Sequence, residues 1–129
     1  MSENFQLEII SPDQTVLKTE TTKVIIPAFE GLMTILKDHI PIVTFMRPGF
    51  IEVEVITGSE KFFIEEGTVE FNNNTLLILS STVLNVKDLS GDRINEILKQ
   101  SNEAIKKQAI NDKEKYILSY KINALKEIN

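Results

Sequence analysis

The stretch FIEVEVITGSEKFFI, residues 50–64, decides the fold. Over residues 51–55 apolar side chains alternate with glutamates, and this period of two is typical of a half-buried β-strand. Gly58 follows where the alternation ends, and a second apolar run occupies residues 61–64. The stretch therefore predicts a β-hairpin.

Further short apolar runs lie on both sides of this hairpin, separated by residues that favour turns. The turn signals include Ser11-Pro12-Asp13-Gln14, Arg47-Pro48-Gly49 and Asn72-Asn73-Asn74, since Pro presets φ and Asn tolerates the left-handed region. Strands are predicted over residues 5–9, 16–21, 24–26, 32–36, 42–46, 69–71 and 75–86. Short strands at this spacing predict a mainly β fold, a β-sandwich or flattened barrel.

The composition changes near Lys87-Asp88, after which the chain has no Pro and many Lys, Glu, Asn and Ile residues. We therefore expect a β-sandwich domain over residues 1–87 and a helical hairpin over residues 88–129. Apolar residues from Ile94 onward recur at helical spacing on one narrow stripe. Ser90 is placed to cap the start of this first helix.

The second helix of the hairpin carries an unusually wide apolar arc. Tyr116, Tyr120 and Ala124 lie on one stripe and Ile122 and Leu125 on the next, so the arc covers more than half of the circumference. A two-helix hairpin buries only one side of such an arc. The remainder faces either the β body or a partner, and the pattern leaves both alternatives open. Short helix pairs are marginal in water, so we expect the hairpin to be stable only when docked.

Charge and composition exclude several classes of protein. The net charge is −5, so the concentrated basic surface that nucleic acids require is absent. The chain has no Cys and hence no disulfide framework. No apolar run approaches the roughly 20 residues that cross a bilayer, and the first residues lack the features of a signal or transit peptide. We expect a soluble, unprocessed protein that meets membranes only through partners.

The sequence offers little for catalysis. His39 is the only histidine, and no Gly-x-Ser-x-Gly elbow or His/Cys spacing for zinc accompanies it. Glu65 and Glu66 are adjacent in a predicted turn, where carboxylates are solvated rather than paired for acid–base work. No phosphate-binding glycine loop occurs. We therefore expect no catalytic residue, no metal site and a binding or regulatory role.

A block in the first half of the chain carries a family resemblance. Glu30-Gly31 precedes a short apolar strand, His39-Ile40-Pro41-Ile42-Val43-Thr44 follows, and Pro48-Gly49 opens the next strand. This order resembles the ε subunit of F-type ATP synthase. The opening residues 7–12 and the layout of strands before a helical hairpin extend the resemblance over nearly the whole chain.

Two segments depart from the family pattern. The family usually has Gly where Thr34 stands and Pro-Gly where Lys37-Asp38 stand. Some members bind ATP through an (Ile/Leu)-Asp-x-x-Arg-Ala motif, and the corresponding register here is Leu89-Ser90-Gly91-Asp92-Arg93-Ile94. Arg93 is retained as a weak nucleotide-binding candidate, but Ser90 and Ile94 replace the acidic and small residues. We expect this chain to bind neither ATP nor another cofactor.

The resemblance implies a non-catalytic rotor subunit in the central stalk of a proton-translocating ATP synthase. The sandwich would bind the γ subunit and rest on the c-ring, and the hairpin would lie on the sandwich or extend along γ toward the α/β hexamer and block ATP hydrolysis. The implied partner interface comprises Glu30, Gly31, Leu32, Met33, His39, Pro41, Tyr116 and Tyr120. The lack of a transit peptide favours a bacterial enzyme, with the subunit peripheral on the cytoplasmic face of the inner membrane.

Two other classes compete with this interpretation. One is a free-standing β-sandwich adaptor whose hairpin captures a helix of an unrelated partner. The other is a small hydrolase that uses His39, which requires a Ser nucleophile nearby in space.

Overall fold

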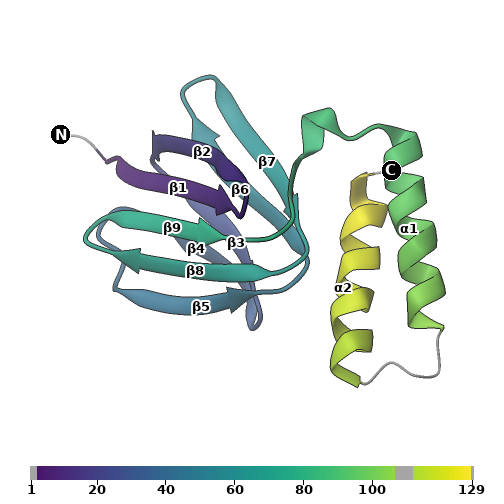
Figure 1. Cartoon of the computed structure of the whole chain (residues 1–129). Coiled ribbons are helices and arrows are strands. Elements are labelled where there is room, and N and C mark those ends of the chain that lie inside the picture. Colours follow the sequence, from purple (N-terminus) through teal and green to yellow (C-terminus); the bar gives the residue numbers. More distant parts are fainter. Residues whose placement is uncertain (1–2, 107–111, 129) are drawn as a thin grey trace.

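The computed structural model describes residues 3–106 and 112–128 of the chain. Figure 1 shows a β body with two antiparallel helices beside it. The strands are β1 (Phe5–Ser11), β2 (Gln14–Thr21), β3 (Val24–Ala28), β4 (Gly31–Ile35), β5 (Ile42–Met46), β6 (Gly49–Val55), β7 (Gly58–Ile64), β8 (Gly67–Asn72), β9 (Thr75–Leu79) and β10 (Val83–Asn85). A 3-10 turn, Val86–Asp88, leads to α1 (Gly91–Ile105) and then α2 (Asp112–Ile128). The predicted fold class, a β-sandwich followed by a helical hairpin, is confirmed.

The strands form two layers that are joined at one corner. Hydrogen bonds link them in the order β10-β7-β6-β3-β5-β8-β9-β1-β2, and β4 pairs with β3. The path passes from one layer to the other between β3 and β5, which share only the pair Ala28–Met46. The layer of β5, β8, β9, β1 and β2 includes a parallel pair, β1 with β9. The core lies between the layers.

Side chains from both layers fill this core, because alternate residues of each strand point inward. Its fully buried members include Ile9, Ile26, Ile51 and Ile78. Phe5 and Phe71 meet edge to face with ring centroids 5.6 Å apart. This arrangement leaves the opposite face of each layer for other contacts.

The hairpin predicted from residues 50–64 is formed by β6 and β7. Val55 pairs with Gly58, and Gly58 adopts a φ of 136° that favours glycine. Ile51 and Val53 are buried, whereas Glu52 points outward to an ion pair with Lys61 across the hairpin. The alternation in sequence therefore separates the core face from the outer face.

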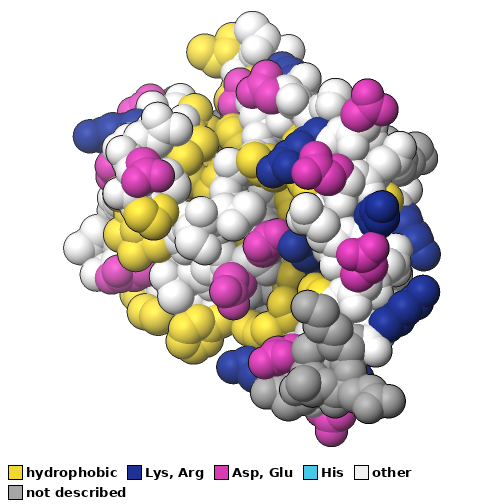
Figure 2. Space-filling model, turned by 45° about the vertical axis from the view of Figure 1, so that its right-hand side comes forward, with side chains coloured by type: hydrophobic (Ala, Val, Ile, Leu, Met, Phe, Trp, Pro, Cys, Tyr) yellow, Lys and Arg dark blue, Asp and Glu magenta, His cyan; other side chains and the backbone are white. Residues whose placement is uncertain are grey.

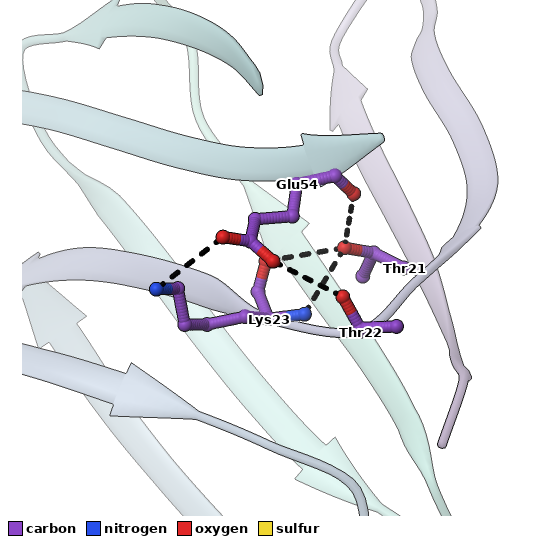
Figure 3. A network of polar contacts seen from close by, with 4 residues as sticks. All are labelled: Thr21, Thr22, Lys23 and Glu54. Carbon is purple, nitrogen blue, oxygen red and sulfur yellow. Dashed lines mark hydrogen bonds and ion pairs between the residues drawn. The ribbon is translucent and has the colours of Figure 1, made fainter. Parts of the chain in front are cut away.

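A polar network ties the end of β2 to β6 in the other layer (Figure 3). The Thr21 hydroxyl lies 2.6 Å from the carbonyl oxygen of Glu54, which is its closest acceptor. The Glu54 carboxylate accepts a hydrogen bond from Thr22 and forms an ion pair with Lys23. These contacts close one side of the sandwich, where no strand ladder joins the layers.

The apolar run 75–86 is divided into β9 and β10 rather than forming one strand. The division falls at Ser80, which is buried and has its hydroxyl within hydrogen-bonding distance of the Glu66 and Thr82 carbonyl oxygens. The hydroxyl also accepts from the Thr82 backbone N–H. These local bonds replace the strand ladder, so the chain leaves one layer after β9 and pairs with β7 in the other.

The helical hairpin packs on the outer face of β6 and β7. Ser90 accepts a hydrogen bond of 3.1 Å from the backbone N–H of Arg93, which confirms it as the helix cap. A second apolar cluster joins the helices to the sandwich, and its buried members are Phe63, Ile94, Ile97, Ala124 and Leu125. The wide arc of α2 is therefore shared between α1 and the β body in this docked arrangement.

Candidate functional site

Five large apolar side chains stay exposed along β4, the β4–β5 loop and β5. We call this set the apolar strip; it consists of Leu32, Leu36, Ile40, Val43 and Phe45. Figure 2 shows hydrophobic side chains gathered along the lower edge of the sandwich, where β5 runs in Figure 1. Leu32 and Val43 are about three-quarters exposed, at 75% and 76%. An exposed apolar group within so short a stretch of chain is typical of a surface that another protein covers.

The strip exists because β5 is apolar on both faces. Met46 is completely buried and Ile42 packs against the core. Val43 and Phe45 alternate with them and point outward, and both stay exposed among the residues that the structure describes. A strand that is apolar on both faces is expected to be covered on both.

The structure brings only some of the predicted interface residues to this surface. Glu30 lies in the β3–β4 turn beside Gly31, whose φ of 139° favours glycine. Leu32 and Pro41 are exposed. Met33 alternates inward and packs against the core, so it offers less surface to a partner.

His39 is held in the β4–β5 loop by structural contacts. Its ring meets Phe71 edge-on with centroids 5.8 Å apart, and its Nδ1 lies 2.7 Å from the Ile40 carbonyl oxygen. Before it, Asp38 adopts a φ of 67° and exchanges two hydrogen bonds with Asn74 in the β8–β9 turn. The loop is therefore fixed to the neighbouring turn. Among residues 3–106 and 112–128, no group of three His, Cys, Asp or Glu side chains could hold a metal.

Arg93 lies on the outer surface of α1. Its guanidinium forms an ion pair of 3.5 Å with Glu96 one turn later, and both side chains are more than half exposed. Ser90 is engaged in capping the helix. The contacts of these two residues are those of a helix start and give no indication of a phosphate site.

The two predicted hairpin residues, Tyr116 and Tyr120, meet the sandwich at its joined corner. Tyr116 stacks on Phe29 with centroids 6.4 Å apart, and its ring meets that of Tyr120 at 4.7 Å. The Arg47 guanidinium lies 4.0 Å from the centre of the Tyr120 ring, a cation–π contact. We call Phe29, Arg47, Tyr116 and Tyr120 the aromatic stack. The hydrogen bond with Tyr116 is the main cause that raises the pKa of the Tyr120 hydroxyl.

The sequence interpretation missed Val43 and Phe45 as surface residues and Arg47 as a partner of the hairpin. The signal for the first two is present, because residues 42–46 are apolar on both faces of a short strand. Arg47 carries no such signal, since its contact with Tyr120 joins a β turn to a distant helix.

The comparisons with known proteins agree with this architecture. Residues 4–86 match the family model described as "ATP synthase, Delta/Epsilon chain, beta-sandwich domain". The chain belongs to this family. An ATP synthase epsilon chain from Pelagibacter ubique is 45% identical over the full length of both chains. An epsilon chain from Jannaschia sp. is 30% identical over 76% of this chain and 74% of its own length.

Solved structures of low sequence identity share the fold. A chain in the Euglena gracilis mitochondrial ATP synthase structure superposes with a TM-score of 0.79 at 18% identity, covering 98% of this chain and 82% of its own. A chain in the Tetrahymena thermophila central stalk structure gives 0.69 at 15% identity, covering 95% and 93%. An epsilon chain is a structural and regulatory subunit of ATP synthase and not a catalytic one.

Proposed function

We propose that this chain is the ε-type rotor subunit of a bacterial proton-translocating ATP synthase, where it connects the γ subunit to the c-ring. The observation that carries the proposal is the full-length identity of 45% to a bacterial epsilon chain. The Euglena structure is described as an OSCP/F1/c-ring assembly and the Tetrahymena one as a central stalk and c-ring. Both descriptions name a c-ring, which supports the c-ring as a partner, and the family resemblance supplies γ.

The apolar strip supports the sandwich as the anchor. Complete burial of a Leu, Ile, Val or Phe side chain contributes about 1.5–3 kcal/mol, so a few such side chains suffice to seat a partner. The strip runs into the β4–β5 loop and reaches the exposed Pro41 and the β3–β4 turn. We assign the outer face of β5 to γ and the loop with its neighbouring turns to the junction with the c-ring.

In the assembled enzyme the subunit is peripheral to the membrane. Neither helix, within the residues that the structure describes, is long and apolar enough to cross a bilayer. We place the subunit on the cytoplasmic face, in keeping with the bacterial origin of its relative.

Residues 88–129 form a separate regulatory part in this proposal, and residues 1–87 form the anchor. The hairpin is docked on β6 and β7, and its release frees the apolar face of α2 for a second docking state. The released hairpin then extends along γ and blocks ATP hydrolysis. Two docking states need only a small difference in free energy to be interconverted.

Co-purification tests the rotor assignment. When the ATP synthase of the source organism is purified, this chain is expected in equal amount to γ. An enzyme that contains γ and lacks this chain would overturn the proposal.

Truncation after Lys87 tests the inhibitory role in the assembled enzyme. The shortened chain should remain bound through the sandwich and the ATP hydrolysis rate should rise. An unchanged rate in an enzyme that retains the shortened chain would show that the hairpin does not inhibit.

A further inference from the structure

The aromatic stack attaches α2 to two turns of the sandwich that lie far apart in sequence. Phe29 belongs to the β3–β4 turn and contacts Tyr116. Arg47 belongs to the β5–β6 turn and covers Tyr120. The hydroxyl groups of Tyr116 and Tyr120 are 3.3 Å apart, so the two contacts are joined to each other.

The same two turns bound the apolar strip. The Phe29 backbone N–H donates to the Phe45 carbonyl oxygen at 3.3 Å, and the Arg47 N–H donates to the Pro27 carbonyl oxygen at 2.9 Å. A side-chain carbon added at Gly49 would lie 2.8 Å from the Pro27 side chain, so the chains approach closely here. The corner is therefore shared by the strip and the hairpin, and Leu32 of the strip lines one cavity together with Arg47 and Tyr120.

The rest of α2 is attached by other means. Leu125 is fully buried in the second apolar cluster, and Lys121 forms an ion pair with Glu65. Tyr116, by contrast, remains 43% exposed. The amino-terminal half of α2 is thus held to the sandwich mainly by the stack, and its docking depends on the geometry of the corner.

We propose that the aromatic stack couples partner binding at the apolar strip to docking of the hairpin. A partner seated on Leu32 and Phe45 fixes the corner and thereby favours the contacts of Tyr116 and Tyr120. Because such coupling is reciprocal, a docked hairpin strengthens partner binding by the same factor. The proposal rests on the proposed function, which supplies γ as the partner.

Hydrogen exchange of the full-length chain, with and without γ from the same genome, tests the coupling. Bound γ is expected to slow amide exchange in residues 116–125 of the wild type. In Arg47→Gln and Tyr120→Leu the exchange of this segment without γ should rise about two- to fivefold, the size of one exposed cation–π contact. The effect of γ on the segment should then largely disappear.

Two variants serve as controls. Tyr120→Phe keeps the ring beneath Arg47 and should retain the response to γ. Lys61→Gln removes a cation that lies 4.5 Å from the Phe50 ring, a contact of the same kind between two residues of the sandwich that does not involve α2, and should also retain it. Unchanged exchange of β1 in every variant shows that the sandwich remains folded.

The outcomes separate the two proposals. If γ does not bind the wild-type chain, the rotor assignment fails and the coupling fails with it. If γ binds but exchange in residues 116–125 is unaltered, or if Arg47→Gln responds like Lys61→Gln, only the coupling is overturned.

Discussion

Single residues set the shape of the loop that carries His39. Asp38, Asn73 and Asn74 adopt positive φ values of 67°, 52° and 55°, which cost energy for residues with a side chain. The family that this sequence resembles usually has Gly where Asp38 stands. Here Asp38 compensates through its bonds of 2.7 and 2.9 Å with Asn74, which also fix the loop to the next turn. The resemblance showed the departure, but the partner that compensates for it became visible only in the structure.

Substitution of Asn74 tests this compensation. Asn74→Ala removes both side-chain bonds and leaves a β-carbon at positive φ, so the free energy of unfolding should fall by about 1–3 kcal/mol. Asn72→Ala, a change in the exposed end of β8, should alter it by less than about 0.5 kcal/mol. Urea denaturation measures both. Equal losses in the two variants would contradict the role given to Asn74.

At the scale of elements, the sequence predicted what depends on local pattern. The alternation over residues 51–55 located β6 and its hairpin, and Ser90 located the start of α1. The break at Ser80 was missed because the carbonyl of Glu66 that it contacts comes from the β7–β8 turn, which is distant in sequence. The aromatic stack was missed for the same reason, since Arg47 and Tyr120 meet only after the layers and the helices have packed.

Leu125 tests how the hairpin element is held. Its side chain projects from α2 and is fully buried in the apolar cluster that joins the helices to the sandwich. Loss of a buried Leu side chain lowers stability by about 2–5 kcal/mol. In Leu125→Ala the hairpin should undock before the sandwich unfolds, so proteolysis should cut residues 91–128 faster while the sandwich stays intact. Lys126→Ala, an exposed neighbour, serves as the control. Equal cleavage of the two variants would show that the cluster does not hold the hairpin.

The whole molecule has an apolar surface on each side of the joined corner. The hairpin covers the outer face of β6 and β7, and the apolar strip on β4, the β4–β5 loop and β5 stays exposed in the described part of the chain. This division of surfaces supports an anchor and a movable regulator within one chain. The wide arc of α2 indicated such a regulator, whereas the location of the anchor surface required the strand order.

Locking the hairpin tests its movement in the assembled enzyme. The chain has no Cys, so Glu65→Cys and Lys121→Cys, placed where the native side chains form an ion pair, accept a short bifunctional maleimide specifically. The bridge should keep the hairpin docked on the sandwich and raise the ATP hydrolysis rate, as truncation after Lys87 is expected to do. The unbridged double variant controls for loss of the ion pair. Persistent inhibition with the bridge in place would contradict a released inhibitory state.

The affinity of the full-length chain for γ tests the anchor most directly, measured by calorimetry on Phe45→Ser and Ile56→Ser. Both remove an exposed apolar side chain, but only Phe45 belongs to the strip, whereas Ile56 lies in the β6–β7 turn and is 106% exposed. The account predicts that Phe45→Ser weakens binding about tenfold or more, as an interface anchor does, and that Ile56→Ser leaves it unchanged. Wild-type affinity in Phe45→Ser would contradict the assignment of the apolar strip to γ.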